Sequence, residues 1–198
     1  MIAIPQIKYK QLPKQYEWVL NEPAPKFHLE AIRHYGIMEI PGPKHDPEIM
    51  KWGKELGVSN VNRTDEVPWC GLFPGICIKR SNPAYPIPRH VYRAKAWLNW
   101  GREVKIGEEP AMWYDILIFD RAGGGHLCWN WGQAGGTLLR PKKYLGYGGN
   151  QSNMVKASWF PGNKLAGIRR CEWLIGQPEN IRTIILDDSG EPYSDTEA

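Results

Sequence analysis

One cysteine in the segment DEVPWCGLF, residues 65–73, has the setting of a nucleophile. Cys70 lies where a short helix is expected to begin, near Trp69. At a helix N-terminus, free backbone N–H groups and the helix dipole favour the thiolate and lower its pKa, as attack on a carbonyl carbon requires. The alternative interpretation is a buried cysteine that acts as a small hydrophobic residue, as most cysteines do.

His126 is the histidine best placed to act as a general base. It follows three glycines and opens a predicted strand, so its imidazole could face a helix terminus from the edge of a sheet. A polar residue that accepts the second ring N–H would fix the tautomer, and Asn150 in LGYGGNQSNMV is the candidate. Because Gly-Gly-Asn is also a turn signal, Asn150 could equally be a turn residue.

The remaining candidates carry weaker signals. A zinc site that includes His126 and Cys128 is conceivable, but the chain has no Cys-x-x-Cys pair and no spaced histidine pair. We therefore expect no metal and no other cofactor. Trp69, next to the cysteine, is the one tryptophan that we place near a substrate, and it could equally pack under the helix.

Helical patterns fill the first half of the chain. They cover residues 25–36, 46–57, a short stretch from about 69, and 89–101. Asp46 is predicted to cap the second helix, with Pro47 at its first position and Gly57 just past its end. Pro74 falls about one turn after Cys70, so we expect it to shorten or kink the third helix.

Short strands separated by glycine-rich turns follow after residue 107. They are expected over residues 113–120, 126–131, 137–140, 153–159 and 166–173. Helices followed by consecutive short strands predict an α+β domain with a mostly antiparallel sheet. These elements would bring the cysteine on a helix against a sheet that carries the histidine and the asparagine.

Length and composition indicate one domain. The chain has 198 residues, of which 42% are hydrophobic, enough for a buried core. We expect an extended arm over residues 1–25, a main domain over 26–174 and an acidic tail over 175–198. The four cysteines are too few and too scattered for a disulfide framework. We find no secretory signal and no run of the ~20 apolar residues that a membrane helix needs.

The charge is unevenly distributed. The net charge is +4, yet residues 172–198 hold seven acidic residues and one arginine, so the rest of the chain is strongly basic. A basic body suits an anionic partner such as a cell-wall polymer, a nucleic acid or a membrane surface. A nucleic-acid partner is the least favoured, because the sequence shows no basic helix, zinc finger or aromatic-basic strand.

In their order, several segments resemble the NlpC/P60 and CHAP group of cysteine peptidoglycan hydrolases, in particular a phage and prophage subfamily. They are GIMEIPG, HDPEIMKW, DEVPWC, RAKAWLNWG, YDILIFDRAGGGH, LGYGGNQSNMV and FPGNKLAGIRRCEW, within residues 27–173. The resemblance implies a papain-like fold, in which helices pack on a mostly antiparallel sheet. It would make residues 26–174 a catalytic domain.

The same resemblance implies roles for single residues. Cys70 would be the nucleophile, His126 the general base and Asn150 the third, polar residue, with Gln151 as the alternative. Trp69 and Gln151 would contact the substrate. The reaction implied is hydrolysis of an amide bond in the stem peptide of peptidoglycan, by an amidase or an endopeptidase, through an acyl-enzyme.

The resemblance favours a phage endolysin or a lysin carried on a virion or tail. Such a protein would act from the host cytoplasm on the cell wall, or travel with the particle, and a secreted effector with the same chemistry is a variant. Its partners would be bacterial peptidoglycan and other virion or tail proteins, without membrane insertion. The alternative from another class is a docking component of a phage particle that keeps the fold with little or no activity.

Overall fold

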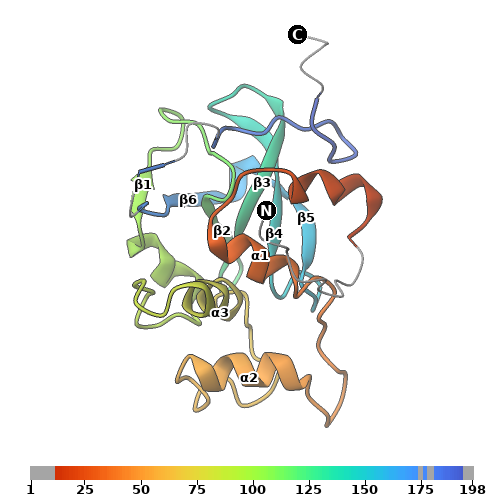
Figure 1. Ribbon diagram of the computed structural model, residues 1–198, viewed down its shortest axis with the longest axis vertical. Coiled ribbons are helices and arrows are strands. Elements are labelled where there is room, and N and C mark those ends of the chain that lie inside the picture. Colours follow the sequence, from red (N-terminus) through yellow and green to blue (C-terminus); the bar gives the residue numbers. More distant parts are fainter. Residues whose placement is uncertain (1–11, 174–175, 178–180, 194–198) are drawn as a thin grey trace, which may run out of the picture.

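A six-stranded antiparallel sheet forms the centre of the computed structural model, which describes residues 12–173, 176–177 and 181–193 (Figure 1). The strands are β1 (Arg102–Val104), β2 (Ile116–Arg121), β3 (Gly124–Gly136), β4 (Pro141–Gly148), β5 (Lys156–Pro161) and β6 (Leu165–Arg170). Their order across the sheet is β1-β6-β2-β3-β4-β5, and all neighbouring strands in this order are antiparallel. The predicted α+β class with an antiparallel sheet is confirmed.

The sheet curls on itself. Strands β5 and β6 are joined only by the short 3₁₀ helix η3 (Gly162–Lys164), although β2, β3 and β4 lie between them in the sheet. The two ends of the sheet must therefore approach each other, and Phe160 of β5 stacks on Phe119 of β2 at 4.8 Å. The concave side encloses a small apolar cluster. That cluster contains Val104, Ala111, Leu117, Phe119, Cys128, Tyr144 and Ile168.

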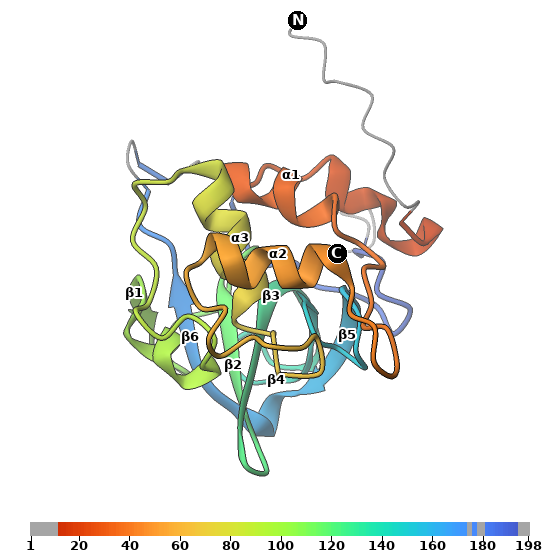
Figure 2. The same ribbon diagram turned by 90° about the horizontal axis from the view of Figure 1, so that it is seen from below.

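The helices lie on the outer side of the sheet, as Figure 2 shows. They are the 3₁₀ helices η1 (Lys14–Leu20) and η2 (Ala94–Asn99) and the α-helices α1 (Lys26–Ile32), α2 (Pro47–Glu55) and α3 (Leu72–Ser81). The predicted cap of α2 is confirmed, because Asp46 Oδ1 accepts from the N–H of Glu48 at 2.9 Å and of Ile49 at 3.1 Å. None of the helices in the described ranges has the length and apolarity of a transmembrane span.

Helix α3 begins later than the sequence predicts. Its first residue is Leu72 and its N-cap is Gly71, so Cys70 lies just before the helix rather than inside it. The carbonyl oxygen of Trp69 accepts from Leu72 N at 3.0 Å and from Phe73 N at 3.3 Å. Pro74 thus falls in the first turn, where a missing N–H costs no intrahelical hydrogen bond, and the expected shortening does not occur.

Strand β4 occupies a segment for which we predict no strand. Residues 137–140, predicted as a strand, instead form the hairpin turn before it, with mutual hydrogen bonds between Thr137 and Arg140. The glycines of β4 serve close packing rather than turning. A Cβ at Gly146 would stand 2.2 Å from Cys128 Sγ, and one at Gly148 would stand 2.8 Å from Gln151 Nε2.

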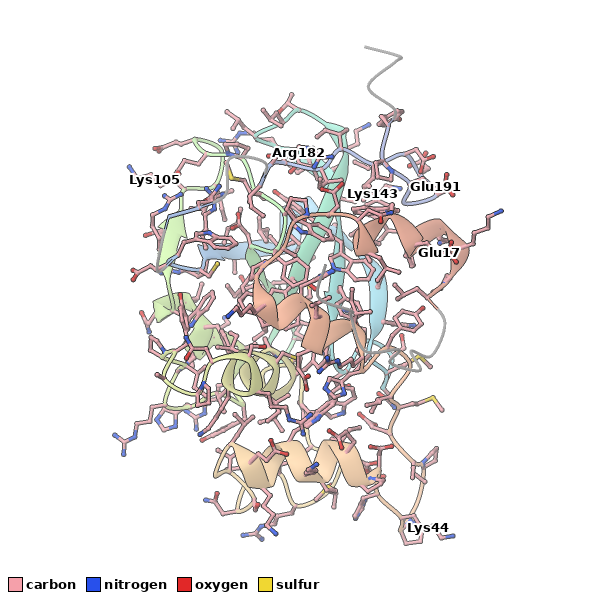
Figure 3. All side chains as sticks on the ribbon, viewed as in Figure 1. Glu17, Lys44, Lys105, Lys143, Arg182 and Glu191 are labelled. Atoms are coloured by element: carbon pink, nitrogen blue, oxygen red, sulfur yellow. The ribbon has the colours of Figure 1, made fainter. Side chains whose placement is uncertain are left out.

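Parts of the predicted arm and tail pack into the same core. Three buried side chains come from the first segment and three from the last: Leu12, Tyr16, Val19, Ile181, Ile184 and Leu186. The two segments also touch, since Trp18 Nε1 donates to the carbonyl oxygen of Gly190 at 3.1 Å. Figure 3 shows Arg182 and Glu191 at one end of the molecule and Lys44 at the other. Residues 1–11 of the predicted arm and residues 175, 178–180 and 194–198 of the predicted tail lie outside the described residues.

Candidate active site

The antiparallel sheet brings three chain segments to one edge. Strand β3 starts where β2 and β4 end, so residues just after β2, at the start of β3 and just after β4 must be neighbours. Arg121 is the last residue of β2, His126 is the third residue of β3, and Asn150 and Gln151 follow β4. The predicted histidine, asparagine and glutamine therefore share this edge.

Cys70 meets this edge from the helical layer. Its side chain is buried, and the backbone N–H of Leu127, the residue after His126, lies beside the sulfur. Burial raises the pKa of the Cys70 thiol, although the Leu127 amide, the charge of Arg121 and the amides of Gly71 and Cys70 itself oppose this effect. The lowered pKa that we expect from a helix N-terminus is therefore wrong, because the cysteine precedes the helix and is desolvated.

His126 is buried with unused hydrogen-bonding capacity. The ring stacks on Phe160 at 5.2 Å between centroids, and neither Nδ1 nor Nε2 has a hydrogen-bond partner among the described residues, Cys70 included. Burial lowers the pKa of His126 to about 4, and the positive charge of Arg121 acts in the same direction. The imidazole is thus neutral at pH 7, which is the form a general base requires.

The side-chain amide of Asn150 is hydrogen-bonded to residues other than His126. In the orientation that satisfies its amide, Nδ2 donates to Glu39 Oε1 at 3.3 Å and Oδ1 accepts from Trp69 N at 3.1 Å. Its backbone is left-handed, with φ 55°, a conformation that asparagine tolerates better than most residues. Asn150 therefore anchors the segment that leads into Cys70 and makes no hydrogen bond to His126.

Gln151, unlike Asn150, has an unused hydrogen-bond acceptor in the pocket of His126. Its side chain is buried, Nε2 donates to the carbonyl oxygen of Gly146 at 3.2 Å, and Oε1 has no partner in the described part of the chain. Gln151 and His126 line the same pocket. A buried unpaired oxygen and two buried unpaired ring nitrogens in one site are an unusual concentration, because buried polar groups are normally hydrogen-bonded.

Trp69 is placed differently from the substrate contact we predict. Its side chain is fully buried, and Nε1 donates to Glu39 Oε1 at 2.8 Å. The ring packs against the backbone of Gly149, where a Cβ would stand 2.5 Å from Cζ3. The buried position of the indole favours the alternative interpretation of a packing role, and the substrate contact stays a prediction.

Two pockets adjoin at the edge and share Arg121, Asn150 and Ser152. The first has a volume of about 390 Å³ and is lined by Phe119, Asp120, Arg121, His126, Asn150, Gln151, Ser152, Ser158, Trp159, Phe160, Pro161 and Lys164. We call it the histidine pocket. The second has a volume of about 590 Å³ and is lined by Glu39, Ile40, Pro41, Gly42, Glu66, Pro68, Arg121, Asn150, Ser152 and Asn153. We call it the acidic pocket.

Two residues in these pockets, Arg121 and Glu39, are not identified by the sequence analysis. Arg121 is exposed and forms no ion pair within the described ranges, and its only signal is its place between a predicted strand and a glycine-rich turn. Glu39 lies 30 residues before Trp69 and 111 before Asn150, so its contacts depend on the fold. Cys70 itself lines neither pocket.

Comparison of the chain with family models, curated proteins and solved structures finds no match. Within the described residues, no group of three or more histidine, cysteine, aspartate or glutamate side chains is arranged to hold a metal ion.

Proposed function

We propose that this protein is a cysteine hydrolase that cleaves an amide bond in the stem peptide of bacterial peptidoglycan, or the bond that links this peptide to the sugar. One observation carries the proposal. The sulfur of Cys70 lies beside the amide of Leu127, directly next to His126, whose two buried ring nitrogens are unpaired. A thiol and a neutral imidazole at one sheet edge are the parts that covalent amide hydrolysis needs.

The resting pair is neutral in this mechanism. The pKa of His126 is lowered to about 4 and the pKa of Cys70 is raised, so the thiol keeps its proton until a substrate carbonyl arrives. The sulfur then attacks the carbonyl carbon while its proton passes to the unpaired imidazole. Because Cys70 lines neither pocket, binding must first displace part of the wall that the two pockets share.

The remaining steps use groups at the same edge. The amides of Cys70 and Gly71 lie beside the sulfur and could stabilise the oxyanion. The imidazolium of His126 protonates the leaving amine, whose C–N bond breaks to give a thioester. The neutral imidazole then takes a proton from water, which attacks the thioester, and the carboxylic acid and the Cys70 thiol are released.

The orienting residue in this mechanism is Gln151. Its Oε1 is buried without a partner among the described residues and lines the same pocket as His126, whereas both amide atoms of Asn150 are occupied. An acceptor on the second ring nitrogen would hold the tautomer and stabilise the imidazolium. Asn150 has the separate task of fixing the backbone before Cys70.

The choice of peptidoglycan rests on the resemblance of the chain to the NlpC/P60 and CHAP group. The antiparallel sheet, with helices on its outer side and Cys70 directly before α3, supports a papain-like arrangement within the α+β class. We extend the proposal to a phage-type lysin, acting on the wall from the host cytoplasm or from the virion.

One observation favours a second candidate, a docking component of a phage particle without activity. The Cys70 thiol is buried, its pKa is raised and it opens onto neither pocket, as an unreactive cysteine would. The two candidates differ in a measurable property. Only the hydrolase requires substrate to reach the sulfur.

The test is digestion of purified sacculi by the wild-type protein, by Cys70→Ala and by Cys171→Ala. Cys171 is also buried but lies after β6, away from the sheet edge, so its variant controls for loss of a buried thiol. Peptide fragments released by the wild type and Cys171→Ala but not by Cys70→Ala would support the hydrolase, and their masses would identify the bond. Folded proteins that release nothing from several wall types would favour the docking component.

A further inference from the structure

The register of β2 and β3 places a cation on the face of the sheet that carries His126. Phe119 pairs with His126 across the two strands, and both rings stack on Phe160, at 4.8 Å and 5.2 Å between centroids. Side chains alternate between the two faces along a strand, so Arg121, two positions after Phe119, lies on the same face as His126. The strand ladder therefore holds a guanidinium near the buried imidazole.

Arg121 also belongs to the wall that the two pockets share. It lines both pockets together with Asn150. Asn150 is held in this wall by its hydrogen bonds to Glu39 and to the backbone of Trp69, whereas the side chain of Arg121 is exposed. Since Cys70 lines neither pocket, a carbonyl group that reaches its sulfur has to pass this wall, and the side chain of Arg121 can move to admit it.

The charge of Arg121 is not neutralised by a contacting carboxylate in the described part of the chain. Its acidic neighbour Asp120 pairs with Lys95 at 2.8 Å instead. Two other arginines show the contrast, since Arg80 and Arg170 each bind a carboxylate at 2.8 Å. The other charged side chains that line the two pockets form no ion pair with Arg121; they are Lys164, Glu39 and Glu66.

The charge of Arg121 acts on both reacting groups. It opposes the rise that burial causes in the pKa of Cys70, and it adds to the burial that lowers the pKa of His126 to about 4. Both effects have one cause, because a positive charge favours an anion at the sulfur and disfavours a cation at the imidazole. During amide hydrolysis the negative charge of the sulfur moves to the carbonyl oxygen, so the same positive charge also favours the tetrahedral intermediate.

We propose that Arg121 is a catalytic residue whose guanidinium stabilises negative charge on the Cys70 sulfur and then donates to the oxyanion of the tetrahedral intermediate. This inference rests on the proposed function. The sulfur electron pair forms the C–S bond and the carbonyl π electrons move to the oxygen, where Arg121 would act with the amides of Cys70 and Gly71. These electrons re-form the C=O bond when the C–N bond breaks.

Arg121 takes no proton in any of these steps, because a guanidinium stays protonated in proteins. The proton of the thiol passes to His126 and from there to the leaving amine. Since the charge of Arg121 disfavours the imidazolium, it promotes this second transfer.

The test uses Arg121→Gln, which removes the charge, and Arg121→Lys, which keeps the charge without the forked geometry. Arg140→Gln is the matched control, because Arg140 is also exposed, forms no ion pair in the described ranges and lies in the turn at the opposite end of β3. Two measurements need no substrate. They are the pH dependence of Cys70 alkylation by iodoacetamide, followed by peptide mass spectrometry, and an NMR titration of His126. Digestion over a range of sacculus concentrations separates kcat from KM.

In Arg121→Gln, we expect the alkylation profile of Cys70 to move to higher pH and the pKa of His126 to rise from about 4. The kcat should fall by about 10²-fold, the scale for loss of one donor to an oxyanion, with little change in KM. Arg121→Lys should recover part of each change, and Arg140→Gln should behave as the wild type.

An unchanged Cys70 profile, or an unchanged kcat in Arg121→Gln while the wild type digests sacculi, would overturn the inference and leave the hydrolase proposal intact. If the wild type digests no wall but the Cys70 profile still moves, the hydrolase and the oxyanion contact are refuted, while the effect of Arg121 on the sulfur stands. An unchanged profile without any digestion would refute both proposals.

Discussion

The two pockets at the sheet edge share a wall but differ in how their polar groups are satisfied. In the histidine pocket, His126 and Gln151 are buried and carry atoms without hydrogen-bond partners among the described residues. In the acidic pocket, the buried side chain of Glu39 accepts from Trp69 Nε1 and from the Asn150 amide. Buried polar atoms are therefore unpaired in the first pocket, whereas the buried carboxylate of the second has donors.

This difference concerns how burial acts on the two side chains. Burial lowers the pKa of His126 to about 4 and raises the pKa of Glu39, so burial drives both side chains toward their neutral forms. For Glu39, the hydrogen bond from Trp69 opposes the rise, whereas His126 has no hydrogen bond among the described residues that would oppose the effect of burial. The neutral imidazole is therefore the group that is left to act as a base.

The strongest test of this division is His126→Gln. Without the base, the thiol cannot lose its proton during attack, and we expect kcat to fall by about 10³–10⁴-fold, as for other members of catalytic triads. Sacculus digestion followed over time gives the rate. His90→Gln, in an exposed loop, is the control. If His126→Gln retains a tenth of the wild-type rate, the histidine pocket is not the catalytic one.

A comparison of Gln151→Ala with Asn150→Ala sharpens the assignment of the orienting residue. Gln151→Ala should lower kcat by about 10²-fold with little change in stability, because it removes the acceptor proposed for the imidazolium. Asn150→Ala should instead cost about 1–3 kcal/mol of unfolding free energy, since Trp69 N would lose its buried acceptor. Urea unfolding and digestion rates measured on both variants decide between them. The reverse pattern would make Asn150 the orienting residue, as we predict from the sequence.

The acid stability of the protein tests the burial of the histidines. Burial lowers the pKa of both His28 and His126 to about 4, so between about pH 6.5 and 4 the unfolded state binds more protons than the folded state. Stability should therefore fall as the pH drops through this window, by about 3 kcal/mol for each histidine. Urea unfolding at several pH values measures the slope. His126→Gln should remove about half of it, and an unchanged slope would show that His126 is solvated.

Trp69→Phe should have the smallest effect. It removes the indole N–H that donates to Glu39, at a cost of about 1 kcal/mol, because the carboxylate can turn toward the solvent in the pocket. Since that hydrogen bond holds the pKa of Glu39 down, the pKa should rise further in the variant. Carbon-13 NMR of the glutamate carboxyls follows the titration. A pKa that stays unchanged would mean that Trp69 does not support the acidic pocket.

Local signals in the sequence predict part of this site. The cap at Asp46, the strands near residues 116–121 and 165–170, and the position of His126 at the start of a strand all depend on neighbours within a few residues. These expectations are confirmed. Antiparallel pairing then brings the segment around Asn150 to the same edge, which the order of the predicted strands anticipates.

The rest depends on contacts that the local pattern does not contain. Burial raises the pKa of Cys70 and outweighs the helix terminus that suggests a thiolate, even though the amide of Leu127, 57 positions away, acts in the opposite direction. The sequence pattern does not reveal strand β4, because Gly146 and Gly148 are residues typical of turns. They are required there because Cys128 and Gln151 lie close to the backbone. Glu39 has no local signal, since both of its partners come from elsewhere in the chain.

The contact between the first and last described segments has a consequence for synthesis. Trp18 meets Gly190, and Gln15 Nε2 donates to the carbonyl oxygen of Ser189, at a separation of 174 residues. At about 5–20 residues per second, the ribosome adds the second partner roughly ten to thirty seconds after the first. Until then the contacts that residues 181–193 make with the core are missing, including the hydrogen bonds from Trp113 N to the carbonyl oxygen of Arg182 and from Gln133 N to that of Ile184.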